Sequence, residues 1–200
     1  MTDFKGKVVL ITGAGKGSGR ELAKGFAKHG AIVAANDISP NNVEDVVGEI
    51  NAGGGQARAY IEDVAKKVGA QALVKQVEDD FGRIDILVNH AAVEPRSPLL
   101  DMDEWDWHRT LDVNLTGAFL MTQSVGRVMR EQGGGVIINL ISDAGRDEHP
   151  MRAVFFASMA GLEAFSQQAA NELAPYGIRV HAVRTNTNLE AILDLCRSTS

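Results

Sequence analysis

The sequence of 200 residues predicts an α/β fold, a doubly wound parallel sheet of about six strands with helices on both faces. Two observations carry this prediction. Short apolar runs alternate with stretches of helical periodicity along the whole chain, and a glycine-rich turn follows the first apolar run. Because no internal repeat or linker interrupts the pattern, we expect a single domain over residues 1–200, with 186–200 as a short C-terminal tail.

The first half of the chain carries four predicted strands and three predicted helices. Each strand run is short and largely apolar, as is typical of strands buried on both faces of a parallel sheet. Each helical stripe ends near a glycine, a common signal for the end of a helix. The strands are expected at 7–12, 31–36, 57–61 and 84–89, and the helices around 22–29, 43–50 and 70–81.

The second half continues the same alternation with two more strands. A long helix is expected from about 112 to 130, with a shorter helix before it from Asp101, and the other elements are a strand at 135–141, a helix at 153–173, a strand at 178–183 and a short helix at 189–196. Ligands of such sheets bind beyond the carboxyl ends of the strands. The loops after the first, second, fourth and fifth strands are therefore where we look for a site.

Composition excludes several classes of function. The formal net charge of −6 and the absence of a dense Lys/Arg cluster argue against nucleic acid or an anionic membrane as partners. The single cysteine, Cys196, excludes an intrachain disulfide, and the scattered histidines predict no metal site. No signal-peptide core or apolar run of membrane-spanning length occurs, so the expected location is cytoplasmic.

The loop after the first predicted strand reads TGAGKGSG, residues 12–19. Gly13, Gly17 and Gly19 permit a tight turn and let backbone N–H groups and the next helix approach a pyrophosphate. Because the loop follows a buried strand and opens a helix, it predicts a dinucleotide site; the alternative is a plain turn between strand and helix.

The second predicted strand ends close to Asp37, about 20 residues beyond the glycine-rich loop. An acid at this position is expected to bind the adenosine ribose hydroxyls and to repel a 2′-phosphate. The alternative is that Asp37 serves as a helix N-cap. Lys16, within the loop, favours the opposite cofactor because a lysine attracts a 2′-phosphate. We predict NAD, with NADP less favoured.

From about residue 5 to 183 the chain resembles the short-chain dehydrogenase/reductase family, whose glycine motif T-G-x-x-x-G-x-G is similar to TGAGKGSG. The resemblance implies a Rossmann-type sheet and a nicotinamide cofactor. It places Ser18 in the phosphate-binding loop, Asp63 on the adenine amino group and Val64 beside it, in "EDV". "NHAA", residues 89–92, stands where the family has N-N-A-G, so Asn89 and Ala91 keep their places while Ala92 replaces a glycine.

The same resemblance extends to the reactive half of the site. Asn114, in "DVNLTG", corresponds to the residue that bends the long helix and holds a water in the family's proton relay. Ser142, in "INLISDAG", corresponds to the serine that hydrogen-bonds the substrate carbonyl. Without a neighbouring tyrosine, Ser142 is better interpreted as a residue that caps the turn at the end of the strand, and Asn114 could equally be structural.

The family's Tyr-x-x-x-Lys motif aligns with Phe155 and Met159. In the family the tyrosine is the general acid/base, and the lysine lowers the pKa of the tyrosine and holds the cofactor ribose. Phenylalanine has no proton to donate and methionine carries no charge. General acid–base catalysis contributes roughly 10²–10⁴-fold, so the resemblance predicts a protein impaired for the usual hydride transfer.

Two further departures agree with impairment. The segment VRTNTN, residues 183–188, lacks the family's Pro-Gly turn, and we expect the final strand and the substrate-covering segment to be missing. One alternative is an active oxidoreductase whose proton comes from His149, a water or the substrate; another is a scaffold domain without a ligand. In either case we expect Phe155, Phe156 and Met159 to pack against the sheet or a partner subunit.

The resemblance also implies a homodimer or a tetramer, paired through the helices that follow the fourth and fifth strands, and we expect the dimer. The apolar side chains expected on that surface belong to Phe119, Leu120, Val125, Val128, Met129 and Phe165. A stripe that faces the core of the monomer would show the same pattern.

Overall fold

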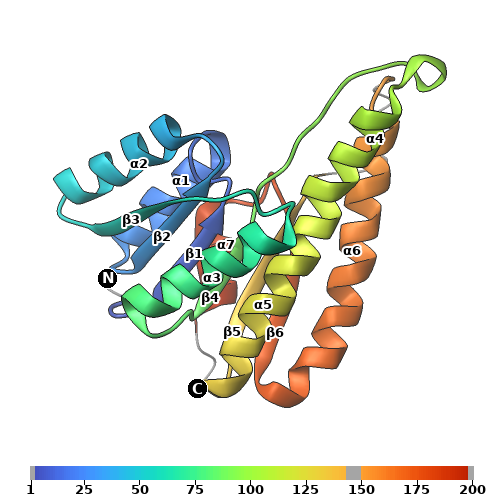
Figure 1. Cartoon of the computed structure of the whole chain (residues 1–200). Helices are drawn as coiled ribbons and strands as arrows, with labels where there is room; N and C mark the ends of the chain where they lie inside the picture. Colours follow the sequence, from blue (N-terminus) through green and yellow to red (C-terminus); the bar gives the residue numbers. More distant parts are fainter. Residues whose placement is uncertain (1–2, 143–149, 198–200) are drawn as a thin grey trace.

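The structure is a computed structural model and describes residues 3–142 and 150–197 (Figure 1). Six strands of the described residues form one sheet in the order β3-β2-β1-β4-β5-β6, and every neighbouring pair is parallel. The predicted parallel α/β sheet is therefore confirmed. The strands are β1 Val8–Thr12, β2 Ile32–Asp37, β3 Gln56–Ile61, β4 Ile86–Asn89, β5 Gly135–Ile141 and β6 Ile178–Arg184.

The helices alternate with the strands as the sequence predicts. The α-helices are α1 Gly17–Lys28, α2 Pro40–Ala52, α3 Lys67–Phe81, α4 Glu104–Leu111, α5 Gly117–Glu131, α6 Ala153–Leu173 and α7 Leu189–Cys196, with 3₁₀ turns η1 Leu99–Asp101 and η3 Ala174–Tyr176. The first three helices begin a few residues before their apolar stripes. In α2 the reason is Pro40, which stands in the first turn, where a missing N–H costs no hydrogen bond.

Helices cover both faces of the sheet, and each face has its own apolar core. On one face, side chains of α1, α2 and α7 pack against alternate residues of the strands, such as Val9 and Ile11. On the other face, α3, α5 and α6 pack against the remaining ones, such as Val8 and Leu10. All five residues of β1 are buried, because this strand lies inside the sheet with helices on both sides.

The predicted long helix is interrupted near its beginning. Between α4 and α5 the chain forms a π-helical turn, η2 Asp112–Thr116, so α4, η2 and α5 form one continuous but irregular helical segment. π-Turns inside helices are frequent at functional sites. No helix of the described residues has the length and apolar character required to cross a membrane.

The strand register places the carboxyl ends of four strands along one edge. Thr12 of β1 pairs with Asn36 of β2, and Asn89 of β4 pairs with Asn139 of β5. The loops that follow β1, β2, β4 and β5 therefore open at the same edge of the sheet, as the parallel arrangement requires.

Candidate functional site

A cavity of about 540 Å³ lies at the carboxyl edge of the sheet. This volume is within the range of pockets that bind small molecules and cofactors, roughly 300–1,000 Å³. Residues at or just after the ends of all six strands line it, together with residues of α4 and of the first turns of α1, α2 and α6. Most of the predicted site residues are among them, namely Gly13, Lys16, Ser18, Asp37, Asp63, Val64, Ala91, Ser142, Phe155 and Met159.

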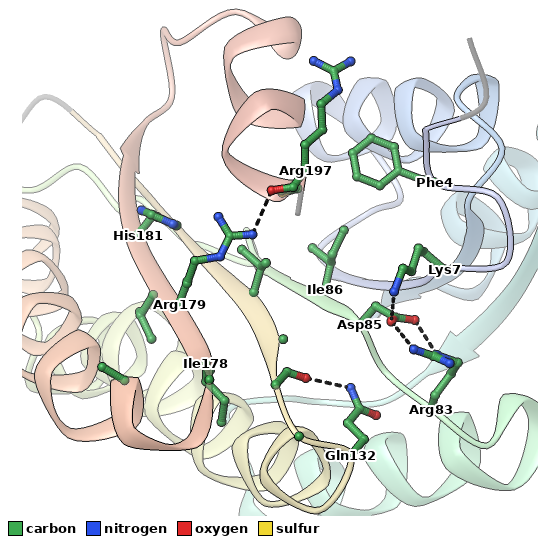
Figure 2. Close-up of a pocket in the computed structure, with 18 of the residues that line it drawn as sticks. Phe4, Lys7, Arg83, Asp85, Ile86, Gln132, Ile178, Arg179, His181 and Arg197 are labelled. Carbon is green, nitrogen blue, oxygen red and sulfur yellow. Dashed lines mark hydrogen bonds and ion pairs between the residues drawn. The ribbon is translucent and has the colours of Figure 1, made fainter. Parts of the chain in front are cut away.

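A second cavity, of about 720 Å³, lies at the opposite, amino-terminal edge (Figure 2). Its charged groups are engaged with neighbouring protein groups. Asp85 accepts hydrogen bonds from Lys7 and Arg83, at 3.0 and 2.5 Å, and Arg179 donates to backbone carbonyls at the end of α7. None of the predicted site residues lines this cavity, so the cavity at the carboxyl edge is the candidate site.

The glycine-rich loop has a backbone that only glycine adopts easily. Gly13 has φ +67°, and a β-carbon there would lie 2.8 Å from the Cα of Ala91. A β-carbon at Gly19 would lie 2.3 Å from the carbonyl oxygen of Gly13. Gly17 begins α1, and the N-cap residue Lys16 makes no side-chain cap. The first-turn N–H groups of α1 thus suit an anionic ligand.

Asp37 ends β2 and is 8% exposed. One carboxylate oxygen accepts a hydrogen bond from the backbone N–H of Gly15 at 3.0 Å, and the other accepts from the N–H of Ser39 at 2.9 Å. The N-cap of α2 is Ser39, so the alternative interpretation of Asp37 as that helix's N-cap is wrong. The side chain instead joins the glycine-rich loop to the end of β2.

Asp63 and Val64 follow β3 and form one wall of the cavity. One oxygen of Asp63 accepts from the N–H of Ala65 at 3.0 Å, and the other lies 3.5 Å from the guanidinium of Arg109. Val64 is buried. Arg109 is on α4 and also lines the cavity. Sequence reasoning missed it, because no motif marks a residue whose helix is brought over the site by the fold.

The residues after β4 bind the glycine-rich loop. The hydroxyl oxygen of Thr12 accepts from the N–H groups of His90 and Ala91, at 3.1 and 3.2 Å. The His90 ring lies within hydrogen-bond distance of Gly13 O and Ser18 Oγ, and it lines the cavity. Burial lowers its pKa, although nearby backbone groups and Asp37 oppose this effect. The sequence pattern alone marks His90 only as a variant position.

Two predicted residues direct their side chains away from the cavity. The amide nitrogen of Asn89 donates to Asn139 at 2.7 Å, inside the protein. Asn114, in the π-turn, accepts from the N–H of Val93 at 2.8 Å and donates to the hydroxyl of Ser158 at 3.0 Å. Both are buried and neither lines the cavity, nor do Gly17 and Gly19. In this structure their contacts shape the surrounding loops.

The cavity wall formed by β5 and α6 is apolar around Ser142, where Phe155 and Met159 line it. Ser142 follows β5, and its backbone N–H lies 3.4 Å from the sulfur of Met159. Phe155 is 6% exposed and Met159 is 3% exposed. The guanidinium of Arg152 stacks 4.9 Å from the centre of the Phe155 ring. It also pairs with Glu94 at 2.7 Å, so this charge is already neutralised.

Neither tyrosine of the chain lines the cavity. Tyr60 donates to Asp80 at 2.7 Å, and Tyr176 lies in η3, after α6. Burial, with Asp80, raises the pKa of the Tyr60 hydroxyl. His149 and its acidic neighbours, Asp143, Asp147 and Glu148, lie outside the described residues. Within 3–142 and 150–197, no group of three His, Cys, Asp or Glu side chains is arranged to hold a metal.

Comparisons with known proteins agree with this geometry. Residues 7–191 match the family described as short chain dehydrogenase. An uncharacterized oxidoreductase of Thermotoga maritima is 43% identical, over 92% of this chain and 73% of the relative. A crystal structure of NAD⁺-bound xylitol dehydrogenase superposes with a TM-score of 0.87 at 34% identity, covering 98% of this chain and 79% of the other. A crystal structure of a metagenomic short-chain oxidoreductase in complex with NADP superposes with a TM-score of 0.92 at 28% identity, covering 98% of this chain and 93% of the other.

Proposed function

This chain belongs to the short-chain dehydrogenase family, and from that premise we propose that it binds NAD in the cavity at the carboxyl edge and is impaired for the family's usual hydride transfer. The observation that carries the proposal is the contrast between the two ends of one cavity. The glycine-rich loop, Asp37 and Asp63 supply polar groups at one end, whereas Phe155 and Met159 close the other with apolar ones.

The dinucleotide end supports cofactor binding through fixed polar groups. The glycine-rich loop leads into the N-terminus of α1, where backbone N–H groups would bind a pyrophosphate. The Asp63 carboxylate, held by Ala65 and close to Arg109, would accept a hydrogen bond from the adenine amino group. These residues would hold the nucleotide, and the bound cofactor would supply the hydride chemistry of the family.

NAD is favoured over NADP by the position of Asp37. Its carboxylate is held at the cavity wall by Gly15 and Ser39, so it is in place to accept from ribose hydroxyls and to repel a 2′-phosphate. Lys16 lines the same cavity and would act in the opposite direction. The known neighbours include both an NAD⁺ complex and an NADP complex, so they leave the preference of this chain open.

Calorimetric titration with NAD and with NADP tests the proposal. We expect NAD to bind more tightly than NADP. Asp37→Ala should reduce the ratio of the Kd for NADP to the Kd for NAD by roughly tenfold, which corresponds to about 1.4 kcal/mol. Asp45→Ala, which removes an equal charge from an exposed position on α2, should leave the ratio unchanged. Tighter binding of NADP would mean that Lys16 dominates, and absence of binding by either cofactor would favour a scaffold domain.

The end of the cavity next to Ser142 supports the proposed impairment of hydride transfer. Phe155 and Met159 stand where the family has its proton-transferring tyrosine and its lysine. Phe155 and Met159 are buried in an apolar cluster with Ala118, Ile141 and Leu162. Ser142 lines the cavity beside them but has no neighbouring phenol with which to share a proton. We infer that Ser142 and Asn114 are remnants of a catalytic set. The protein would then act as a binding or sensor domain.

We also propose that the protein forms a homodimer through α5 and α6. The two helices run side by side (Figure 1), and a groove of about 400 Å³ lies between them. Phe119 and Tyr176 line it and are 40% and 45% exposed, and Phe165 packs edge-on against Phe119. The expectation that Val125 and Met129 contribute is wrong, because both are fully buried in the core.

A further inference from the structure

The imidazole of His90 spans the glycine-rich loop. It approaches Gly13 O through Nδ1, at 3.1 Å, and Ser18 Oγ through Nε2, at 2.8 Å. It also fills the space that a side chain at Gly19 would need, because a β-carbon there would lie 2.6 Å from Nδ1. One ring therefore contacts both sides of the loop that faces the cofactor cavity.

The two partners determine which ring nitrogen carries the proton. A carbonyl oxygen only accepts hydrogen bonds, so Nδ1 must donate to Gly13 O. In the neutral ring Nε2 is then an acceptor, and the Ser18 hydroxyl must donate to it. The Ser18 hydrogen is thus directed at His90, and the oxygen lone pairs of Ser18 are the part left for a ligand.

Protonation of His90 reverses this arrangement. Both ring nitrogens of a charged imidazole donate, so Nε2 donates to Ser18 Oγ, and the Ser18 hydroxyl hydrogen is released toward the cavity. A phosphate oxygen accepts from that hydroxyl but is repelled by its lone pairs. We propose that His90 is a positioning residue that makes dinucleotide binding proton-coupled, by turning the Ser18 hydroxyl toward the cofactor phosphates. This inference rests on the proposed binding of NAD.

The other charges around the cavity bear on the same proton. Asp37 favours the charged form of His90, as would the phosphates of a bound dinucleotide. The cations Lys16 and Arg109 oppose the charged form. The other charged residues that line the cavity are Glu62, Asp63 and Glu94. Burial keeps His90 neutral in the free protein at neutral pH. Since the phosphates favour the charged ring, the complex binds the proton more tightly than the free protein does. Affinity for the dinucleotide should therefore rise as the pH falls toward the pKa of His90, which burial places below its ordinary value.

Isothermal titration of the protein with NAD between pH 8.0 and 5.5, in buffers of different ionisation enthalpy, tests the proposal. We expect proton uptake on binding and a Kd that falls about threefold or more from pH 7.5 to 5.5, since one linked proton permits at most about tenfold per pH unit. Binding without proton uptake, at constant affinity, would overturn the inference and leave the proposed function intact. Absence of binding at every pH would overturn both.

Three variants identify the groups responsible. His90→Asn should abolish the pH dependence of NAD affinity, because it removes the titrating ring. Ser18→Ala should weaken that dependence, because it removes the hydroxyl that the ring turns and leaves only the direct attraction between the ring and the phosphates. His29 lies at the end of α1 and outside the cavity, so His29→Asn should keep the wild-type dependence of the NAD Kd on pH. A wild-type slope in Ser18→Ala would show that charge alone acts, and would overturn the hydroxyl switch. Because Ser18→Ala only deletes one oxygen, its result stands even if His90→Asn does not fold.

Discussion

At the scale of single residues, the proposed impairment rests mainly on two positions. Phe155 and Met159 stand one helical turn apart on α6, and both side chains face the cavity and the small apolar cluster beneath it. Neither can transfer a proton or hold a positive charge. The guanidinium of Arg152 is stacked on Phe155 and paired with Glu94, so we do not expect it to take the role that the family's lysine has.

The wild-type protein should therefore show no measurable NAD-dependent oxidation or reduction of a panel of alcohols and ketones. The double substitution Phe155→Tyr with Met159→Lys restores the proton donor and its cation, but we expect it to recover little activity. The segment 183–188 lacks the family's Pro-Gly turn, and positioning is worth as much as acid–base chemistry. The absorbance of reduced nicotinamide in steady state measures the rates.

A matched control is Phe156→Tyr with Met159→Lys, which adds the same groups with the phenol one residue away from the aligned position. It should remain inactive. Robust turnover by the wild type, abolished by His149→Ala, would contradict the impaired interpretation and identify a substitute acid.

At the scale of elements, Asp85 connects the central strands at the edge opposite the cofactor cavity. Its carboxylate accepts hydrogen bonds from Lys7 at 3.0 Å and from Arg83 at 2.5 Å (Figure 2). It also accepts from the backbone N–H of Val8 at 2.9 Å. The backbone N–H of Asp85 donates a hydrogen bond to the carbonyl of Val8 in β1, and its carbonyl accepts one from the N–H of Val136 in β5. Burial tends to raise the pKa of Asp85, but its hydrogen bonds with Arg83, Val8 and Lys7 outweigh burial and lower it.

Asp85→Asn should destabilise the fold by roughly 1–3 kcal/mol, because it leaves partly buried donors without a charged acceptor. A lowered pKa in the folded state stabilises the protein above the ordinary pKa of the carboxyl, and this contribution is lost as pH falls through the folded value. The difference between variant and wild type should therefore be full at pH 7 and shrink below about pH 4. Urea unfolding at several pH values measures it.

Asp79→Asn is the control for this effect. Asp79 pairs with Lys75 on the exposed side of α3, and such surface pairs contribute about 0–1 kcal/mol. Equal destabilisation by the two substitutions would show that the connection through Asp85 has no special importance for the sheet.

At the scale of the whole molecule, the paired helices α5 and α6 leave aromatic side chains exposed on one side. Phe119 and Tyr176 lie at the groove between the helices, and Arg130 stacks 5.7 Å from the centre of the Tyr176 ring. Exposed aromatic and arginine side chains are typical of protein interfaces. The helices present these groups together because their other faces are used by the core.

Light scattering should give a dimer at micromolar concentration, and Phe119→Asp should shift it toward monomer by placing a charge in the interface. Val68→Asp, which adds a charge at an exposed position on α3, should leave the dimer intact. A strictly monomeric wild type would contradict the proposed assembly.

The sequence by itself determined the order of the elements and the edge of the sheet at which the candidate site lies. Apolar runs of strand length and helical stripes follow from local periodicity, and the parallel connections then place the loops after β1, β2, β4 and β5 together. The helix at 153–173 and the strand at 135–141 have the predicted bounds. Gly13 and Gly19 mark the loop because a β-carbon at either position would lie too close to the backbone.

Only the tertiary structure decided which side chains meet. His90 and Ser18 are 72 positions apart, and their contact exists because β4 lies beside β1. Arg109 reaches the cavity through α4, whereas Asn89 and Asn114 turn into the interior. The apolar periodicity of a segment predicts which of its faces is buried, but not which other elements that face contacts. Contacts between distant segments depend on how the whole sheet packs.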